Sequence, residues 1–282
     1  IESLSRGAAR VTFVDKSKDS IALVRENLKG IDGDYAIVNS DFMSALNGAV
    51  YNGIKYDVIF LDPPYASNLA EIAIDFILEH DMLTEYGVIV FEHGSEKTYT
   101  LANGAYKQRT KRMGTITAEF ISRRRIALMA GSFDPITKGH EAVLDEALSR
   151  YDEVVVACLI NPDKTYTFTD EQRLALVEAV CEYKKGARAL FSDKYAVEVA
   201  KEQGACALVR GIRNDADRAY EEDMAKYNSE HGVDTVFIEL NDYCDISSTA
   251  VREQLIRGDY SSVPAATVPL LQSEEYAARL KA

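Results

Sequence analysis

The residues best suited to chemistry form one ten-residue run, Gly131-Ser132-Phe133-Asp134-Pro135-Ile136-Thr137-Lys138-Gly139-His140. Apolar residues 126–130 precede it, and apolar residues at helical spacing follow it in 142–148. We therefore expect a loop between a strand and a helix. Such a loop directs backbone N–H groups and the positive end of the helix dipole above the sheet, which suits a phosphate. On spacing alone, the alternative is an ordinary strand–helix turn with a structural histidine.

The glycines of this run fit a phosphate loop. Gly131 would let a ligand approach the backbone closely, and Gly139 leaves room beside His140. The end of the run, Thr137 to His140, resembles the (H/T)xGH signature of the nucleotidyltransferase superfamily. That resemblance implies that His140 stabilises the charge developing on the α-phosphate of a nucleoside triphosphate while pyrophosphate leaves.

Further polar groups follow the other strands expected in residues 124–282. Strands are predicted at 153–160, 189–191, 207–209 and 235–240 with helices between them, a Rossmann-like parallel layout. The polar groups at the strand ends are Lys164, the pair Arg210 and Arg213 around Gly211, and Ser247-Ser248-Thr249 at a helix start. Guanidinium groups and helix N-termini bind anions. The alternatives are a solvated lysine and a plain N-cap.

These segments together resemble the pantetheine-phosphate adenylyltransferase family along nearly all of residues 124–282. The matching segments are G-S-F-D-P-I-T-K-G-H, N-P-D-K, R-G-I-R-N-D-A-D, A-Y-E-E and I-S-S-T-A-V-R-E. Members of this family join 4′-phosphopantetheine to the AMP part of ATP, giving dephospho-coenzyme A and pyrophosphate. The resemblance implies Mg²⁺ with the triphosphate, coenzyme A or dephospho-coenzyme A as further ligands, and a homo-oligomer, usually a hexamer.

The resemblance also assigns site residues. The residues implied in catalysis are His140, Lys164 and Arg210. The residues implied in ATP binding are Ser132, Phe133, His140, Gly211, Ile212, Arg213, Glu221, Tyr243, Cys244, Asp245, Ile246, Ser247, Ser248 and Thr249. The residues implied in phosphopantetheine binding are Ser132, Lys164, Ala196 and Arg210, with Ala196 smaller than the usual apolar residue. No carboxylate cage for a metal is visible in the sequence.

Other functions for this half compete with the first. A nucleotidyltransferase could act on nicotinamide mononucleotide or on a cytidylyl acceptor, but Arg210 with Lys164 favours phosphopantetheine and I-S-S-T disfavours the cytidylyl branch. An RNA-binding methyltransferase module with a degenerate nucleotide-sensing partner is a rival of a different class. The presence of His140, Lys164, Arg210 and Arg213 argues against degeneracy.

Residues 1–123 alternate strands and helices in a doubly wound α/β pattern. Strands are expected at 11–14, 35–38, 57–61 and 88–91, and residues 105–122 predict an antiparallel hairpin turning near Met113 and Gly114. The third strand runs into Asp62-Pro63-Pro64-Tyr65. A carboxylate there can accept a hydrogen bond from an exocyclic amino group, and an aromatic ring can stack on an extruded base. A proline-terminated strand with a structural tyrosine is the alternative.

The context of this motif carries a second resemblance. E-S-L-S-R-G-A-A-R-V-T-F-V-D, S-D-F and L-D-P-P-Y resemble the family that methylates guanine N2 in small-subunit ribosomal RNA. It implies that Asp15 holds the ribose of S-adenosylmethionine, that Asp41 lies near its adenine, and that Asp62 and Tyr65 face the target base. Basic residues could contact RNA phosphates or form the solvated face of an edge hairpin; they are Lys107, Arg109, Lys111 and Arg112.

The start of the chain limits this second resemblance. The sequence opens at Ile1 within an expected helix, and the family's glycine-rich loop and first strand have no counterpart in it. We therefore expect a fragment or processed product that does not methylate as given, with S-adenosylmethionine as a cofactor only of a complete domain. The full-length parent is then expected to be bifunctional.

Composition sets the outer bounds. The chain has 282 residues, 47% of them hydrophobic, and a net charge of −13, which argues against broad nucleic-acid binding. Residues 1–123 carry 13 Lys and Arg against 17 Asp and Glu, a net of −4, so the rest carries −9. We expect two Rossmann-like α/β domains, 1–123 with an incomplete class I methyltransferase sheet and 124–282 with a nucleotidyltransferase parallel sheet.

The four cysteines indicate the compartment. They are Cys158, Cys181, Cys206 and Cys244, and no two lie at CxxC spacing. Three have apolar neighbours, so buried thiols in a reducing cytoplasm are expected. No segment has transmembrane length and no signal peptide is visible.

Overall fold

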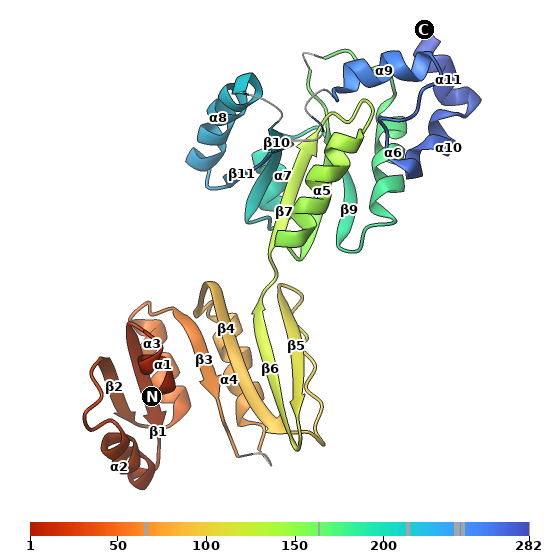
Figure 1. The fold of residues 1–282 in the computed structure, drawn as a ribbon. Helices are drawn as coiled ribbons and strands as arrows, with labels where there is room; N and C mark the ends of the chain where they lie inside the picture. The colour runs from red at the N-terminus through yellow and green to blue at the C-terminus, as the bar shows by residue number, and fades with distance from the viewer. Residues whose placement is uncertain (65–66, 163, 213–214, 240–242, 244–245, 282) are drawn as a thin grey trace. The chain divides into compact units, whose positions relative to one another are not determined.

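The computed structural model describes residues 1–64, 67–162, 164–212, 215–239, 243 and 246–281. Contacts along the chain define two compact units, Ile1–Arg123 and Arg124–Ala282, which we call the first unit and the second unit (Figure 1). Each unit has a hydrophobic core of its own.

The first unit contains two separate sheets. One pairs two parallel strands, β1 (Arg10–Asp15) and β2 (Asp34–Asn39). The other has the order β3-β4-β6-β5 and consists of β3 (Tyr56–Leu61), β4 (Leu83–Gly94), β5 (Tyr106–Met113) and β6 (Ile116–Arg123). The helices of this unit are α1 (Glu2–Ser5), α2 (Lys18–Asn27), α3 (Phe42–Tyr51) and α4 (Leu69–Glu79).

The expected α/β alternation is confirmed in this unit, with two differences. The strands do not form one sheet, because β1 and β2 pair separately from β3, β4, β6 and β5. The predicted hairpin is β5–β6, in which Met113 pairs with Ile116. Helix α3 was not expected, since its sequence contains Asn47 and Gly48, which are weak helix formers.

The core of the first unit lies on one face of its larger sheet. Helix α4 packs Ala73, Ile74 and Ile77 against Ile89, Phe91 and Ile121 of the sheet. On the opposite face, Val58 is 58% exposed and Phe60 is 57% exposed. A sheet with parallel strands normally buries both faces, so this exposed side is unusual.

The second unit is built on one parallel sheet of five strands. Its order is β11-β10-β7-β8-β9, formed by β7 (Ile126–Gly131), β8 (Glu153–Leu159), β9 (Ala187–Ser192), β10 (Ala207–Ile212) and β11 (Asp234–Glu239). The strands predicted from sequence are confirmed here. The order reverses between β7 and β10, the topological switch at which ligands bind in such sheets.

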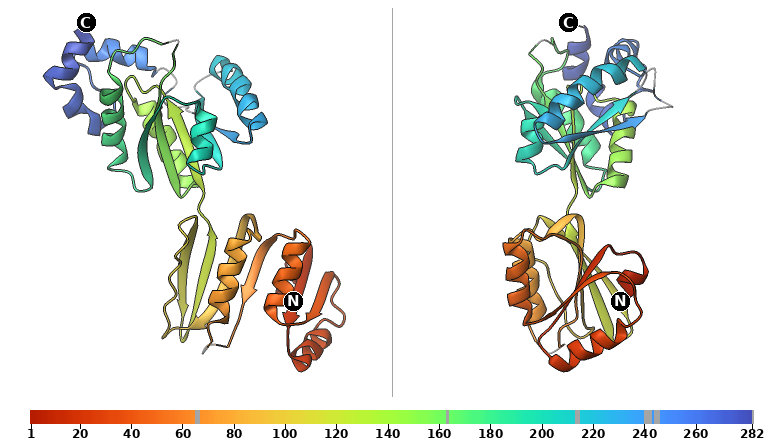
Figure 2. Two further views of the ribbon diagram at one scale, coloured as in Figure 1. Left: turned by 180° about the vertical axis from the view of Figure 1, so that it is seen from behind. Right: turned by 90° about the vertical axis from the view of Figure 1, so that its left-hand side faces the viewer.

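Helices cover both faces of this second sheet (Figure 2). One face packs against α5 (Lys138–Arg150), α6 (Asp170–Cys181), α9 (Ser248–Ile256) and α11 (Glu274–Lys281). The other face packs against α7 (Ala196–Glu202), while α8 (Asp215–Glu230) lies on β10 and β11. Strand β8 shows the result, because Val154, Val155, Val156 and Ala157 are all 0% exposed.

The C-terminal segment adds elements that were not expected from sequence. They are a 3-10 turn, Ala265–Thr267, and two helices, α10 (Val268–Leu271) and α11. Leu271 and Tyr276 complete the core on the α6 side of the sheet.

The cysteines of this unit differ in exposure. Cys158 and Cys181 are buried and Cys206 is exposed, while Cys244 lies outside the described residues. Burial raises the pKa of the Cys158 and Cys181 thiols to about 11, so both are protonated at neutral pH. In the described part of the chain, no helix combines the length and apolar character needed to cross a membrane.

Candidate active site

The residues expected at the site follow different strands but share one edge of the second sheet. Ser132 follows β7, Lys164 follows β8, Ala196 begins the helix after β9, Arg210 lies near the end of β10, and Ser247 follows β11. Because all five strands are parallel, their carboxyl ends meet at the same edge.

The loop after β7 ends in a reciprocal cap on α5. Thr137 Oγ1 accepts a hydrogen bond from the His140 backbone N–H at 3.4 Å. In return, His140 Nδ1 accepts a hydrogen bond from the Thr137 backbone N–H at 3.0 Å. A backbone nitrogen can only donate, so Nδ1 is unprotonated and Nε2 carries the ring proton. The cap therefore makes His140 a neutral hydrogen-bond donor through Nε2, beside the positive end of α5.

The Phe133 ring packs against the His140 ring. The Phe133 side chain is only 2% exposed, and the two rings meet edge to face with centroids 5.1 Å apart. A Cβ atom added to Gly131 would lie 3.0 Å from the Phe133 ring. Gly131 therefore leaves room for the Phe133 ring, and close approach of a ligand to its backbone stays a prediction. Any contact of Phe133 with a nucleotide has to come from its backbone.

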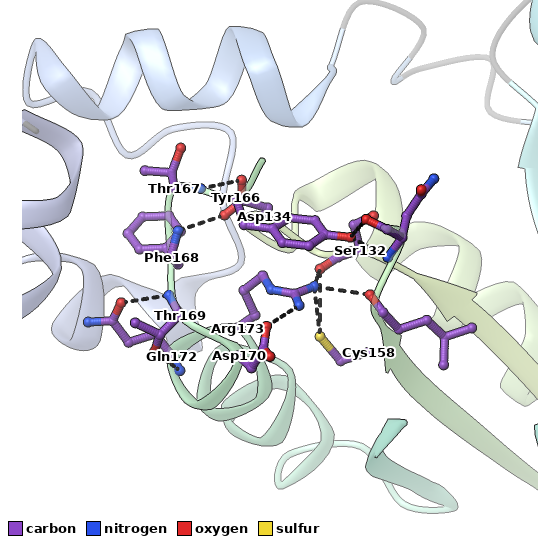
Figure 3. Close-up of polar contacts among 12 residues, drawn as sticks. Ser132, Asp134, Cys158, Tyr166, Thr167, Phe168, Thr169, Asp170, Gln172 and Arg173 are labelled. Carbon is purple, nitrogen blue, oxygen red and sulfur yellow. Dashed lines mark hydrogen bonds and ion pairs between the residues drawn. The ribbon is translucent and has the colours of Figure 1, made fainter. Parts of the chain in front are cut away.

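Asp134 anchors the same loop to two other elements. Its carboxylate is buried and accepts hydrogen bonds from the backbone N–H groups of Thr167 and Phe168, both at 3.0 Å. Figure 3 shows these bonds to the segment ahead of α6. Arg252 of α9 donates to the Asp134 backbone oxygen at 2.5 Å and pairs with the carboxylate at 3.3 Å.

The first turn of α9 is joined directly to this loop. Ser247 caps the helix by accepting from the Ala250 N–H at 3.1 Å. Ser248 Oγ donates to the Pro135 backbone oxygen at 3.0 Å, and Thr249 Oγ1 accepts from Arg252 at 3.2 Å. Each of the three hydroxyls thus has a partner in the protein. The groups of this turn that are suited to bind an anion are therefore its backbone N–H groups.

Arg210 lies across the topological switch. Its Nη1 donates to the Ala130 backbone oxygen of β7 at 2.6 Å, and its Nε lies 3.5 Å from Glu221 Oε2. The side chain remains 25% exposed. This arrangement holds a guanidinium at the end of β7, and it engages Glu221 in an ion pair with Arg210. Gly211 and Ile212 continue β10, with the Ile212 side chain buried.

The remaining ATP and phosphopantetheine positions are more scattered. Lys164 is exposed, and its backbone N–H bonds to the Asn161 oxygen at 3.0 Å. Tyr243 and Ile246 pack against the main core, and Ala196 packs against the smaller one. Arg213, Cys244 and Asp245 lie outside the described residues.

Three residues that hold the site together were missed from sequence: Asp134, Arg173 and Arg252. Arg173 is 0% exposed on α6 and donates to the Ser132 backbone oxygen. The sequence did contain a signal, because Arg173 shares a helical face with the buried residues Leu176, Val177 and Val180. A charged residue on an apolar face predicts a buried, paired charge.

In the first unit, the expected methyltransferase-like residues follow three strands in two sheets. Asp15 Oδ1 accepts from the Ser17 N–H at 2.7 Å, and Asp41 caps α3. Bonds from the Ser44 hydroxyl and N–H hold the pKa of Asp41 below its usual value. Asp62 and Pro64 are exposed after β3, Pro63 is half-buried between them, and Tyr65 lies outside the described residues.

The basic residues of this unit lie on β5, an edge strand. Arg109 stacks over the Phe120 ring at 4.5 Å, while Lys111 and Arg112 are exposed and Lys107 is half-buried. Within the described ranges, no three His, Cys, Asp or Glu side chains gather into a set that could hold a metal.

Comparison with known families divides the chain into two matching segments. Residues 1–122 match the family model described as conserved hypothetical protein 95. Residues 128–254 match the model described as cytidylyltransferase-like.

Solved structures resemble part of the chain. A protein of Haemophilus influenzae described as a methylase is 25% identical with a TM-score of 0.37, covering 43% of this chain and 77% of that one. A protein of Escherichia coli described as a methyltransferase is 24% identical with a TM-score of 0.38, covering 43% of this chain and 68% of that one.

Curated relatives match at greater identity. The phosphopantetheine adenylyltransferase of Clostridium novyi is 36% identical over 137 residues, covering 48% of this chain and 85% of the relative. That of Chromobacterium violaceum is 38% identical over 130 residues, covering 45% of this chain and 79% of the relative. With most of such a relative's length covered at this identity, the chain belongs to the phosphopantetheine adenylyltransferase family.

Proposed function

We propose that the second unit transfers the adenylyl group of ATP to 4′-phosphopantetheine, giving dephospho-coenzyme A and pyrophosphate. One observation carries the proposal: at the switch between β7 and β10, a hydrogen bond joins the loop of residues 131–140 to the first turn of α9, and Arg210 bonds to Ala130 directly before that loop. Membership of the adenylyltransferase family supports the choice of substrates.

The chemistry needs no covalent enzyme intermediate. A phosphate oxygen of phosphopantetheine attacks the α-phosphorus of ATP in line, a new P–O bond forms, and the bond to the bridging oxygen of pyrophosphate breaks. Negative charge grows on the oxygens around the α-phosphorus during this step. His140 Nε2–H is the donor that stabilises this charge, because the cap through Nδ1 holds the ring in its neutral Nε2–H form.

Cationic groups at the same edge hold the acceptor. Arg210 and Lys164 bind the phosphate of phosphopantetheine, and the N–H groups at the start of α9 bind phosphates of ATP. The nucleotide enters as its Mg²⁺ complex, with the ion carried by the triphosphate. Because of the family resemblance, we extend the proposal to a homo-oligomer, whose mass light scattering would measure. The buried thiols of Cys158 and Cys181 are consistent with a reducing cytoplasm.

For the first unit we propose no methyl transfer in this chain. Asp15 ends β1 and Asp62 follows β3, and these strands belong to different sheets, so they do not form the continuous sheet that a cofactor would span. Calorimetry with S-adenosylmethionine is expected to show no binding, and a micromolar dissociation constant would contradict this.

The first test is pyrophosphate release from ATP and Mg²⁺ with phosphopantetheine, with nicotinamide mononucleotide, or with no acceptor. Release only with phosphopantetheine is expected. His140→Ala should lower kcat by about 10²–10³, because one donor to the developing charge is lost. His80→Ala, on the exposed end of α4 in the first unit, serves as control and should leave turnover unchanged. Near-normal kcat in His140→Ala would refute the role of His140.

Arg210→Ala tests the acceptor site separately. Loss of a charge-assisted hydrogen bond of about 1.5–3 kcal/mol should raise the KM for phosphopantetheine roughly tenfold or more, with a smaller effect on ATP. An unchanged KM for phosphopantetheine would remove Arg210 from the acceptor site. Circular dichroism controls for the lost bond to Ala130.

A further inference from the structure

Arg173 is a fully buried cation that the proposed reaction does not use. It lies on α6 with 0% of its surface exposed. A guanidinium stays charged at all accessible pH values, and burying it is unfavourable unless it is paired and hydrogen-bonded. What it bonds to therefore indicates what it does.

The guanidinium reaches from α6 to the ends of two neighbouring strands. Nη1 donates to the Ser132 backbone oxygen at 2.5 Å and to the Leu159 backbone oxygen at 3.2 Å, and it lies 3.4 Å from Cys158 Sγ. Nη2 donates to Asp170 Oδ1 at 2.6 Å, the ion pair that compensates the charge. Figure 3 shows the group between the ends of β7 and β8.

The packing around the guanidinium leaves little freedom. The Tyr166 ring covers its plane, with Cζ 3.9 Å from the ring centroid. Cys158 Sγ lies 3.6 Å from the same Ser132 oxygen, as a protonated thiol, since burial raises the pKa of Cys158 to about 11. The Ser132 oxygen is thus held by a fully buried cation, and a hydrogen bond is stronger in the protein interior than in water.

This bond fixes a peptide plane next to the proposed active site. The Ser132–Phe133 peptide is trans, so a Ser132 oxygen directed at Arg173 forces the Phe133 N–H to face the opposite way. Phe133 itself has φ 48°, in the left-handed region that a bulky residue rarely adopts. Such a conformation persists only where its surroundings hold it in place, and it is common at functional sites.

We propose that Arg173 is a positioning residue for adenylyl transfer, an inference that rests on the proposed function. It locks the Ser132–Phe133 peptide, and with it the Phe133 ring that supports His140, in the orientation the reaction requires. Its complete burial excludes direct contact with substrate. This role depends on the forked shape of the guanidinium, which donates hydrogen bonds to the ends of both strands and to Asp170 at the same time.

The test uses Arg173→Lys in the full chain, with Arg150→Lys as the matched control. A lysine keeps the charge but lacks the planar fork. Arg150 is an exposed arginine of α5 that pairs with Glu146, in the same unit. We expect Arg173→Lys to lower kcat/KM by about 10- to 100-fold per folded molecule, since displacements near 1 Å cost this much, and Arg150→Lys to stay within twofold.

Hydrogen exchange of the peptide covering residues 130–141 provides a readout independent of activity. Arg173→Lys should speed exchange in this peptide while the β10 peptide, residues 207–212, which Arg173 does not contact in the described part of the chain, stays as protected as in the unchanged chain. Equal loss of protection in both peptides would show a general structural role and overturn the proposal. So would a kcat/KM within threefold of the unchanged protein with exchange unaltered.

The two failures can be told apart. If the unchanged protein releases no pyrophosphate with phosphopantetheine, the proposed function fails. The exchange of residues 130–141 then still decides whether Arg173 holds the loop. If the unchanged protein is active and Arg173→Lys alters neither measurement, only the positioning role fails.

Discussion

The two units of this chain use the same alternation of strands and helices with different results. In the second unit, residues 154–157 of β8 are fully buried between two helical layers. In the first unit, Val58 and Phe60 of β3 are more than half exposed, and β1 and β3 belong to different sheets. Parallel strands need cover on both faces. The comparison teaches that alternating strands and helices in the sequence set the order of the elements. Whether the strands then pair into one continuous sheet determines whether their carboxyl ends form one site.

Among the described residues, Glu119 in the first unit and Asp134 in the second have buried carboxylates with different roles. Glu119 of β6 accepts from Gln108 at 2.9 Å and Thr110 at 2.6 Å and contacts His93 at 3.3 Å, all within one sheet. Asp134 instead joins three separate segments around the His140 loop. Glu119 therefore stabilises a sheet, whereas Asp134 holds together the segments that form the candidate active site.

The largest expected effect comes from removing these carboxylates. Asp134→Ala and Glu119→Ala should each lower the free energy of unfolding of their own unit by about 3 kcal/mol or more, because buried partners lose their acceptor. Only Asp134→Ala should also abolish turnover. Denaturation followed by hydrogen exchange in each unit, with pyrophosphate release measured alongside, checks this. Loss of turnover in Glu119→Ala would show that the two units do not act separately.

The two faces of the first unit's larger sheet give the next contrast. Phe91 is 3% exposed beside α4, so Phe91→Ala should cost about 3–5 kcal/mol. Phe60 is 57% exposed, so Phe60→Ala should change stability by less than about 1 kcal/mol. Urea denaturation of both variants provides the measurement. A large loss in Phe60→Ala would mean that its face is covered in solution.

The stability of the two units should respond differently to alkaline pH. Burial raises the pKa of Cys158 and Cys181 from 9.0 to about 11, so between these values the unfolded chain releases protons that the folded one keeps. Stability of the second unit therefore falls as pH rises from 9 to 11, by at most about 2–3 kcal/mol per thiol. In the first unit the pKa of Tyr99 is raised from 10.0 to about 12, so the corresponding loss begins one pH unit higher.

Alanine at the buried cysteines checks the assignment of this pH dependence. Cys181→Ala should flatten the loss of stability above pH 9, whereas Cys206→Ala, at an exposed position, should leave it unchanged. An equal slope in all three proteins would assign the effect to other groups.

The smallest effect concerns helix caps. Thr169 caps α6 reciprocally with Gln172, at 3.2 and 3.0 Å, and Ser17 caps α2 through one bond at 3.3 Å. Thr169→Ala should cost about 1 kcal/mol and Ser17→Ala less, since a reciprocal cap satisfies two N–H groups. Thermal unfolding compares the pair. A larger cost for Ser17→Ala would contradict the ranking.

Much of this molecule followed from sequence because the signals are local. The strands of the second unit, its capped helices and the loop from Gly131 to His140 each depend on residues within a few positions of one another. The family resemblances likewise came from short contiguous motifs, and the expected functional positions remain predictions that the proposed assays test.

Contacts between distant residues decided the rest. Ser132 and Arg173 are 41 positions apart, and Asp134 and Arg252 are 118 apart, so no local pattern links them. The tertiary structure alone placed the Phe133 ring beside Gly131, split the first unit into two sheets and buried Arg173. The physical reason is that periodicity fixes which face of an element is apolar, whereas the partner of a buried charge depends on which elements pack together.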